Sequence, residues 1–177
     1  MNESALRPTI LKYGLTGGLI LSLQFLVFTI SGLAGSTSKS VGFLSGCISL
    51  VITIGLIIFA IKQHRDQVQE GYISLGQCVL IGTGVLVLAA LISGVVSLIY
   101  TNIIDPGYME RVAAKMEEAW EAQGLSEDQI EQAKKWTGFM KNPFLTLATT
   151  LACYAIGGAI ISLIVGLIMK KEKPEFS

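Results

Sequence analysis

The chain has few of the residues from which catalytic and metal sites are built. It contains one histidine, His64, among 177 residues, which excludes a two-histidine metal site or proton relay. Its three cysteines, Cys47, Cys78 and Cys153, stand singly, without the paired spacing of zinc or redox sites. Whether Cys47 and Cys153 form a disulfide is left undecided by the sequence. We predict no catalytic residue, no metal and no cofactor.

Charge is also scarce. Charged residues make up 15% of the chain and hydrophobic residues 51%, so a water-soluble protein of this size would lack polar atoms to cover its surface. Because 13 basic residues balance 13 acidic ones, no nucleic-acid partner is expected. Lipid is expected to cover part of the protein.

Four long stretches contain no charged residue. They run from 21 to 26 residues, and a helix needs about 20 residues to cross a hydrocarbon core of roughly 30 Å. The sequence therefore predicts an all-α integral membrane protein, with residues 1–177 forming a single four-helix domain. The predicted spans are Tyr13 to Leu33, Val41 to Ile61, Val79 to Tyr100 and Phe144 to Met169.

The first stretch has an alternative interpretation as a cleaved signal peptide. Arg7 and Lys12 precede it, and small residues follow from Ser31 to Ser36. The apolar run that begins at Leu15 is longer than the roughly 7 to 15 residues of a signal-peptide core. A retained first span is therefore favoured.

The spans also lack the ionisable residues that ion-coupled transporters use. Gln24 is the one strongly polar side chain well inside a span, beside scattered serine and threonine hydroxyls. We expect Gln24 to form an interhelical hydrogen bond rather than to contact a substrate.

The distribution of basic residues predicts the orientation. Seven of the 13 lie in the two tails and in the loop between spans two and three, and Lys170 and Lys171 directly follow span four. Loop 101–142 has more acidic than basic residues, and none of the ten residues after span three is basic. By the positive-inside rule, both termini are cytoplasmic and loop 101–142 is extracytoplasmic.

That loop has the pattern of a helical hairpin over about residues 105–141. Asp105 before Pro106 predicts a first helix, and Gly124 predicts its end. Ser126 followed by Gln129 predicts a capping box for a second helix, which Asn142 and Pro143 would end. The helices carry acidic outer faces and apolar stripes.

Trp120 and Trp136 lead those apolar stripes. Such stripes either pack against each other or on the bilayer surface, or form a docking site for an extracytoplasmic partner. Trp120 and Trp136 are therefore candidate partner contacts.

Small residues four positions apart line one face of each span. Such faces let helix backbones approach closely, either within the bundle or in a homo-oligomer. Packing within the bundle is favoured. The faces are Gly14 with Gly18, Gly42 with Gly46, Ala90 with Gly94, and Gly158 with Ser162 and Gly166.

The loop between spans two and three is the most distinctive stretch. Lys62 and Arg65 are placed to contact phosphate headgroups, with Asp66 restraining Arg65, and Tyr72 suits the interface. His64, between the two basic residues, is expected in a solvated loop at headgroup level. We predict that Lys62, Arg65 and Tyr72 contact membrane lipid.

Four short motifs lie along the chain: Tyr13-Gly14-Leu15, Lys62-x-x-Arg65-Asp66, Gly71-Tyr72-Ile73-Ser74-x-Gly76 and Lys141 to Phe144. With them the chain resembles, over nearly its whole length, a bacterial family of unknown function, domain of unknown function 4199. It implies a bacterial inner-membrane protein with four spans and a charged helical loop between spans three and four. It implies no activity.

The scarcity of reactive groups predicts a non-enzymatic protein that acts as a scaffold or accessory subunit for a partner. The alternative is a transporter or binder of a lipid or small neutral solute, which would use Gln24 and the hydroxyls around a neutral cavity. A membrane-level cavity favours the second function, and a filled bundle with an exposed patch on the hairpin favours the first. An enzyme ranks third, because it would need a cluster of carboxylates or histidines assembled from the loops.

Overall fold

The computed structural model describes residues 3–33, 39–139 and 142–171, and every named element in this part of the chain is helical. Four long helices correspond to the predicted spans, and two shorter ones form the insertion between the third and fourth. A five-residue π-helix, η2, continues the third long helix. The helices are α1 (Glu3–Ile30), α2 (Lys39–Gln67), α3 (Leu75–Ile99), η2 (Tyr100–Ile104), α4 (Tyr108–Ala122), α5 (Glu127–Phe139) and α6 (Pro143–Met169).

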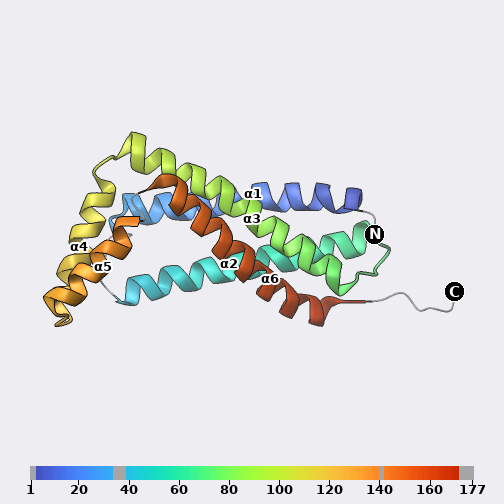
Figure 1. Cartoon of the computed structure of the whole chain (residues 1–177). Helices are drawn as coiled ribbons and strands as arrows, with labels where there is room; N and C mark the ends of the chain where they lie inside the picture. Colours follow the sequence, from blue (N-terminus) through green and yellow to red (C-terminus); the bar gives the residue numbers. More distant parts are fainter. Residues whose placement is uncertain (1–2, 34–38, 140–141, 172–177) are drawn as a thin grey trace.

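Helices α1, α2, α3 and α6 form the membrane bundle. Within the described residues, four helical segments are long and apolar enough to cross a bilayer, which confirms the predicted fold class. The start of α1 and the end of α6 lie at one end of the bundle, and α4 and α5 lie at the opposite end (Figure 1). We call these the termini end and the hairpin end.

Helix α3 is the centre of the bundle, because small residues let both α1 and α6 approach it. A Cβ atom on Gly14 of α1 would lie 2.6 Å from Leu88 of α3, and one on Gly18 would lie 2.7 Å from Ile92. On the other face of α3, a Cβ on Gly82 would lie 1.9 Å from the Ser162 Oγ of α6. A Cβ on Gly94 of α3 would likewise lie 2.6 Å from Leu147 of α6. The predicted small-residue faces of spans one, three and four therefore pack inside the bundle.

The face predicted in span two behaves differently. A Cβ on Gly42 or Gly46 of α2 would meet no atom within 4 Å. Helix α2 therefore does not use these glycines for close packing within the chain.

Helix α1 begins well before the predicted span, at Glu3. Leu6 and Thr9 of this first part are 4% and 7% exposed, and Leu6 belongs to the apolar core that includes Ile57, Ile61 and Ile81. The segment before Tyr13, expected to be a tail, is thus a packed part of the first helix.

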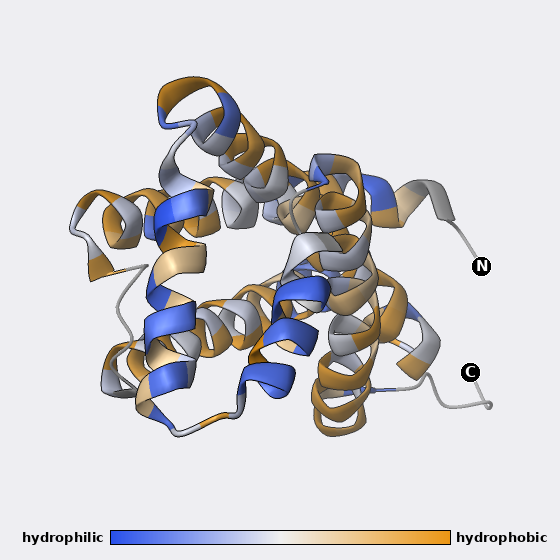
Figure 2. Cartoon of the chain, turned by 60° about the vertical axis from the view of Figure 1, so that its left-hand side comes forward, coloured by the Kyte–Doolittle hydropathy of each residue, from blue (hydrophilic) through white to orange (hydrophobic). Residues whose placement is uncertain are grey.

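The predicted hairpin is present as α4 and α5, and its ribbon is largely hydrophilic whereas the long helices are largely apolar (Figure 2). The capping box is confirmed: the Ser126 backbone N–H donates to Gln129 Oε1 at 3.0 Å and the Gln129 N–H to Ser126 Oγ at 3.4 Å. The predicted start at Asp105 is wrong. Helix α4 begins at Tyr108 without a side-chain cap, because the Asp105 carboxylate pairs with Arg111 instead.

Large apolar side chains cover the outside of the bundle. Phe43, Phe144 and Ile168 are 76%, 83% and 80% exposed within the chain. In water this surface would be strongly unfavourable, whereas acyl chains solvate it.

Candidate functional site

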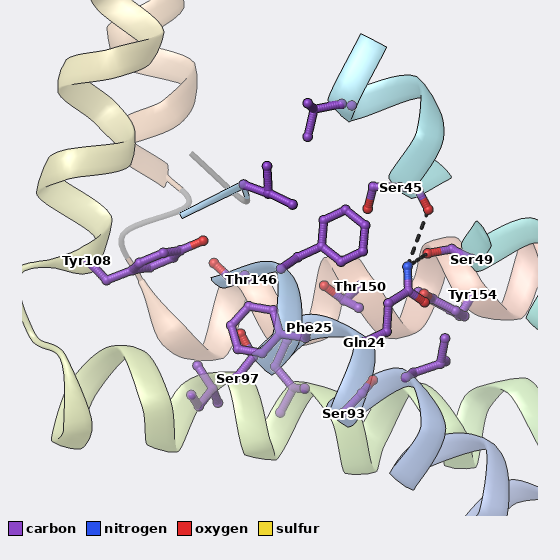
Figure 3. A pocket seen from close by; sticks show the side chains of 18 residues that line it. Gln24, Phe25, Ser45, Ser49, Ser93, Ser97, Tyr108, Thr146, Thr150 and Tyr154 are labelled. Carbon is purple, nitrogen blue, oxygen red and sulfur yellow. Dashed lines mark hydrogen bonds between the residues drawn. The ribbon is translucent and has the colours of Figure 1, made fainter. Parts of the chain in front are cut away.

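A cavity of about 430 Å³ lies in the hairpin-end half of the bundle. Its walls come from α1, α2, α3 and α6, and Tyr108 reaches toward it from α4 (Figure 3). The volume is about three times that of the roughly 150 Å³ engineered cavity that holds one benzene molecule. It is within the range of about 300 to 1,000 Å³ for small-molecule sites.

The cavity exists because α2 and α6 separate toward the hairpin end (Figure 1). Near the termini end the bundle is filled by large side chains such as Ile57, Ile61 and Ile81, which are completely buried. Toward the hairpin end, α2 presents Gly42 and Ser45 to the cavity instead. Small side chains on a diverging helix leave space unfilled.

Gln24 of α1 is held in the wall of the cavity. Its Nε2 donates to Ser49 Oγ at 2.8 Å and to the Ser45 carbonyl at 3.3 Å, which confirms the predicted interhelical hydrogen bond. Its Oε1 is buried and accepts no hydrogen bond within the described part of the chain. An acceptor left unpaired away from water is costly, and Gln24 is held in the wall by its amide nitrogen alone.

The rest of the polar lining is made of hydroxyl groups. They come from α2, α3, α4 and α6, and no charged side chain accompanies them in the lining of this cavity. Without a carboxylate or an imidazole, these hydroxyls have no neighbouring base that would activate a nucleophile. They are suited to hydrogen bonding with a ligand. The residues are Ser45, Ser49, Ser93, Ser97, Tyr108, Thr146, Thr150 and Tyr154.

The spacing of hydroxyl residues along the sequence is a signal for this cavity, which counting the polar residues of each span does not reveal. The hydroxyl residues recur four positions apart on three helices: Ser45 with Ser49, Ser93 with Ser97, and Thr146 with Thr150. A spacing of four places both members of each pair on one helix face. The sequence does not indicate that these three helix faces line one cavity together with Gln24.

His64 lies at the other end of the bundle, in the last turn of α2, and its predicted solvated position is wrong. The side chain is completely buried. Its Nδ1 lies 3.0 Å from Thr9 Oγ1 of α1, and its Nε2 lies 3.3 Å from Gln69 Nε2. The imidazole thus joins α1 to the end of α2.

Arg65 is likewise engaged within the chain. Its Nε donates to Asp66 Oδ1 at 2.7 Å, as predicted, and its Nη1 donates to the Met169 carbonyl at 3.5 Å. That carbonyl lies at the end of α6, where carbonyl groups lack helical partners. Arg65 therefore links the ends of α2 and α6.

The other two predicted headgroup contacts lie nearby. Tyr72 has the Lys171 ammonium 5.5 Å from its ring centroid, beside a backbone bridge between Ile73 and Lys171. Lys62 is exposed. Lipid contact by Lys62, Arg65 and Tyr72 stays a prediction.

The remaining candidates are not brought together into a site. Trp120 is half-buried in α4, and the side chain of Trp136 lies outside the described part of the structure. Cys47, Cys78 and Cys153 are free thiols. No group of three or more His, Cys, Asp or Glu residues that could hold a metal ion occurs among the described residues.

The helical bundle and its lipid-facing surface define a multi-pass membrane protein. The chain belongs to the family described as protein of unknown function (DUF4199), whose profile matches residues 12–171. The resemblance expected from the sequence motifs is thereby confirmed. No curated protein and no solved structure matches the chain.

Proposed function

We propose that this protein is a non-enzymatic membrane protein that binds the uncharged part of a lipid-like molecule in the cavity around Gln24. The observation that carries the proposal is a cavity of about 430 Å³ whose polar lining consists of Gln24 and hydroxyl side chains, with no charged side chain among the residues that line it. Hydroxyl groups supply further donors and acceptors, and Leu21, Phe25 and Leu147 supply apolar walls. This mixture suits a molecule that is mostly apolar and carries a few hydrogen-bonding groups.

A scaffold that docks a partner through the hairpin is less well supported. Such a site would need an exposed apolar patch. Among the large apolar side chains that the structure describes in α4 and α5, Met116 is the exposed one, at 38%, whereas Ile130 is buried between the helices. Trp120 is half-buried, which favours its role in packing the hairpin.

The family resemblance and the basic residues support a location in the bacterial inner membrane. The hairpin, and the cavity beside it, would then face the extracytoplasmic leaflet, with both termini in the cytoplasm. A ligand would reach the cavity from that leaflet between α2 and α6.

The proposal can be tested by a substitution that fills the cavity with a larger side chain. Thr150 lines the cavity and is half-buried, whereas its neighbour Thr149 is exposed and does not line it. Thr150→Phe should displace the ligand, and Thr149→Phe, an identical change on the lipid-facing side of α6, should not. Native mass spectrometry of protein released from nanodiscs would count the lipids that each variant retains.

We expect the wild type and Thr149→Phe to retain one lipid per chain that Thr150→Phe loses. A thermal unfolding curve for each variant would establish that both are folded. Equal retention in two folded variants would contradict the proposed function.

A further inference from the structure

A second, smaller pocket of about 90 Å³ adjoins the cavity at the hairpin end. It lies between the end of α1, with Thr29 in the last turn and Gly32 just beyond it, and the first turns of α4. Tyr108 lines both pockets, so the two pockets adjoin at this side chain. That ring packs edge-on against Tyr100, with ring centroids 5.9 Å apart.

The two compartments differ in charge. The large cavity is lined by uncharged side chains, whereas the small pocket is lined by Arg111, Lys115 and Asp105. Asp105 pairs with Arg111. Lys115 makes no ion pair within the described part of the chain, so two cations against one carboxylate leave a net charge of one positive.

The geometry points to this small pocket as a binding site for the anionic headgroup of a lipid whose apolar part occupies the large cavity. Arg111 and Lys115 supply the donors that a phosphate oxygen accepts from. The arrangement also follows the polarity of a bilayer, because the charged pocket lies where α1 ends and the neutral cavity lies along the span. This inference rests on the proposed function and names its ligand as an amphipathic molecule with a phosphate head.

Two probes with the same chain length distinguish binding of the headgroup from binding of the apolar chain. They are dodecyl phosphate, which is anionic, and monododecanoylglycerol, which is uncharged. Their affinities for the full-length protein in nanodiscs of neutral lipid would be measured by competition against a fluorescent lipid. We expect the wild type to prefer dodecyl phosphate by about tenfold, and the preference to fall with added salt, because salt screens exposed charges.

Lys115→Gln should abolish most of this preference while leaving the affinity for monododecanoylglycerol unchanged. Lys135→Gln is the matched control, since Lys135 lies on the same hairpin, is 71% exposed and pairs with Glu131 away from the pocket. An unchanged preference in Lys115→Gln would overturn the inference. Inorganic phosphate that binds as tightly as dodecyl phosphate would overturn the assignment of a lipid.

The failures of the two proposals are distinguishable. If Thr150→Phe eliminates binding of both probes while Lys115→Gln leaves their ratio unchanged, the cavity function stands and the headgroup site is overturned. If the wild type binds neither probe, both proposals fail together.

Discussion

At the scale of single residues, two kinds of polar group inside the bundle differ in what they contribute to it. His64 and Gln24 link helices through hydrogen bonds. The hydroxyls of Ser162 and Thr83 are buried without a partner in the described residues. Because an unpaired hydroxyl contributes no hydrogen bond, the first group holds the helices together, whereas the second adds bulk at close helix contacts.

The His64 contacts are mutually consistent for a neutral ring. Since the Gln69 side-chain nitrogen can only donate, the His64 Nε2 accepts from it and the proton resides on Nδ1, which donates to Thr9 Oγ1. Both ring nitrogens are thereby satisfied in a side chain that water does not reach. A buried imidazole of this kind fixes α1 against α2 at the termini end.

Thr9→Val tests this link. The change keeps the shape of the side chain but leaves the His64 N–H without an acceptor, so we expect the free energy of unfolding to fall by about 1 to 3 kcal/mol. Thr16→Val is the control, because Thr16 is exposed and bonds within its own turn. Denaturation in mixed micelles would measure both, and equal losses would contradict a structural role for the Thr9–His64 hydrogen bond.

At the scale of the helices, α3 organises the bundle because its partners approach through glycine. Ser162 of α6 fits against Gly82, and Leu88 and Ile92 of α3 fit against Gly14 and Gly18. In lipid, close packing and polar contacts drive helix association, since burial from water does not distinguish one helix neighbour from another. The α1–α3 and α3–α6 contacts therefore depend on the absence of a Cβ at these positions.

Gly82→Ala should destabilise the bundle. The added methyl group would overlap Ser162, and overpacking of this kind costs about 1 to 3 kcal/mol in the free energy of unfolding. Gly46→Ala makes the same chemical change on α2 in open space and should leave stability equal or slightly higher, because alanine favours a helix over glycine. The same micelle denaturation compares the two variants, and equal stability would show that α3 and α6 are not closely packed at Gly82.

At the scale of the whole molecule, the bundle has two unlike ends. The termini end is filled and joined by the contacts of His64, Arg65 and Lys171. The hairpin end holds the cavity and the small charged pocket. A binding site at the less tightly packed end leaves the other end to provide stability.

The orientation of these ends in the membrane follows from the basic residues and is open to a direct test. In a cysteine-free variant, a cysteine at Gln123, in the hairpin, should react with an impermeant reagent added to intact cells. A cysteine at Gln67, at the termini end of α2, should react only after the cells are opened. Labelling of Gln67 but not of Gln123 in intact cells would reverse the assigned orientation.

Local sequence patterns predict the number and type of the helices in this protein, although not every helix start. Uncharged apolar runs fix four membrane helices, the Ser126–Gln129 pair fixes the start of α5, and Gly124, with a φ of +76°, suits the turn before it. These features are local, because the length of an apolar run and the spacing of a cap do not depend on distant residues. The family resemblance was local as well, since it rests on short motifs.

The tertiary structure decided which residues meet. Only the packing of α1 against α2 removes His64 from solvent, and only the separation of α2 from α6 turns scattered hydroxyls into the lining of one cavity. The side chain of Asp105 was available as a helix cap, but Arg111 lies one turn into α4 and pairs with it instead. Burial and cavity formation depend on the distances between helices, and a pattern along one helix carries no information about those distances.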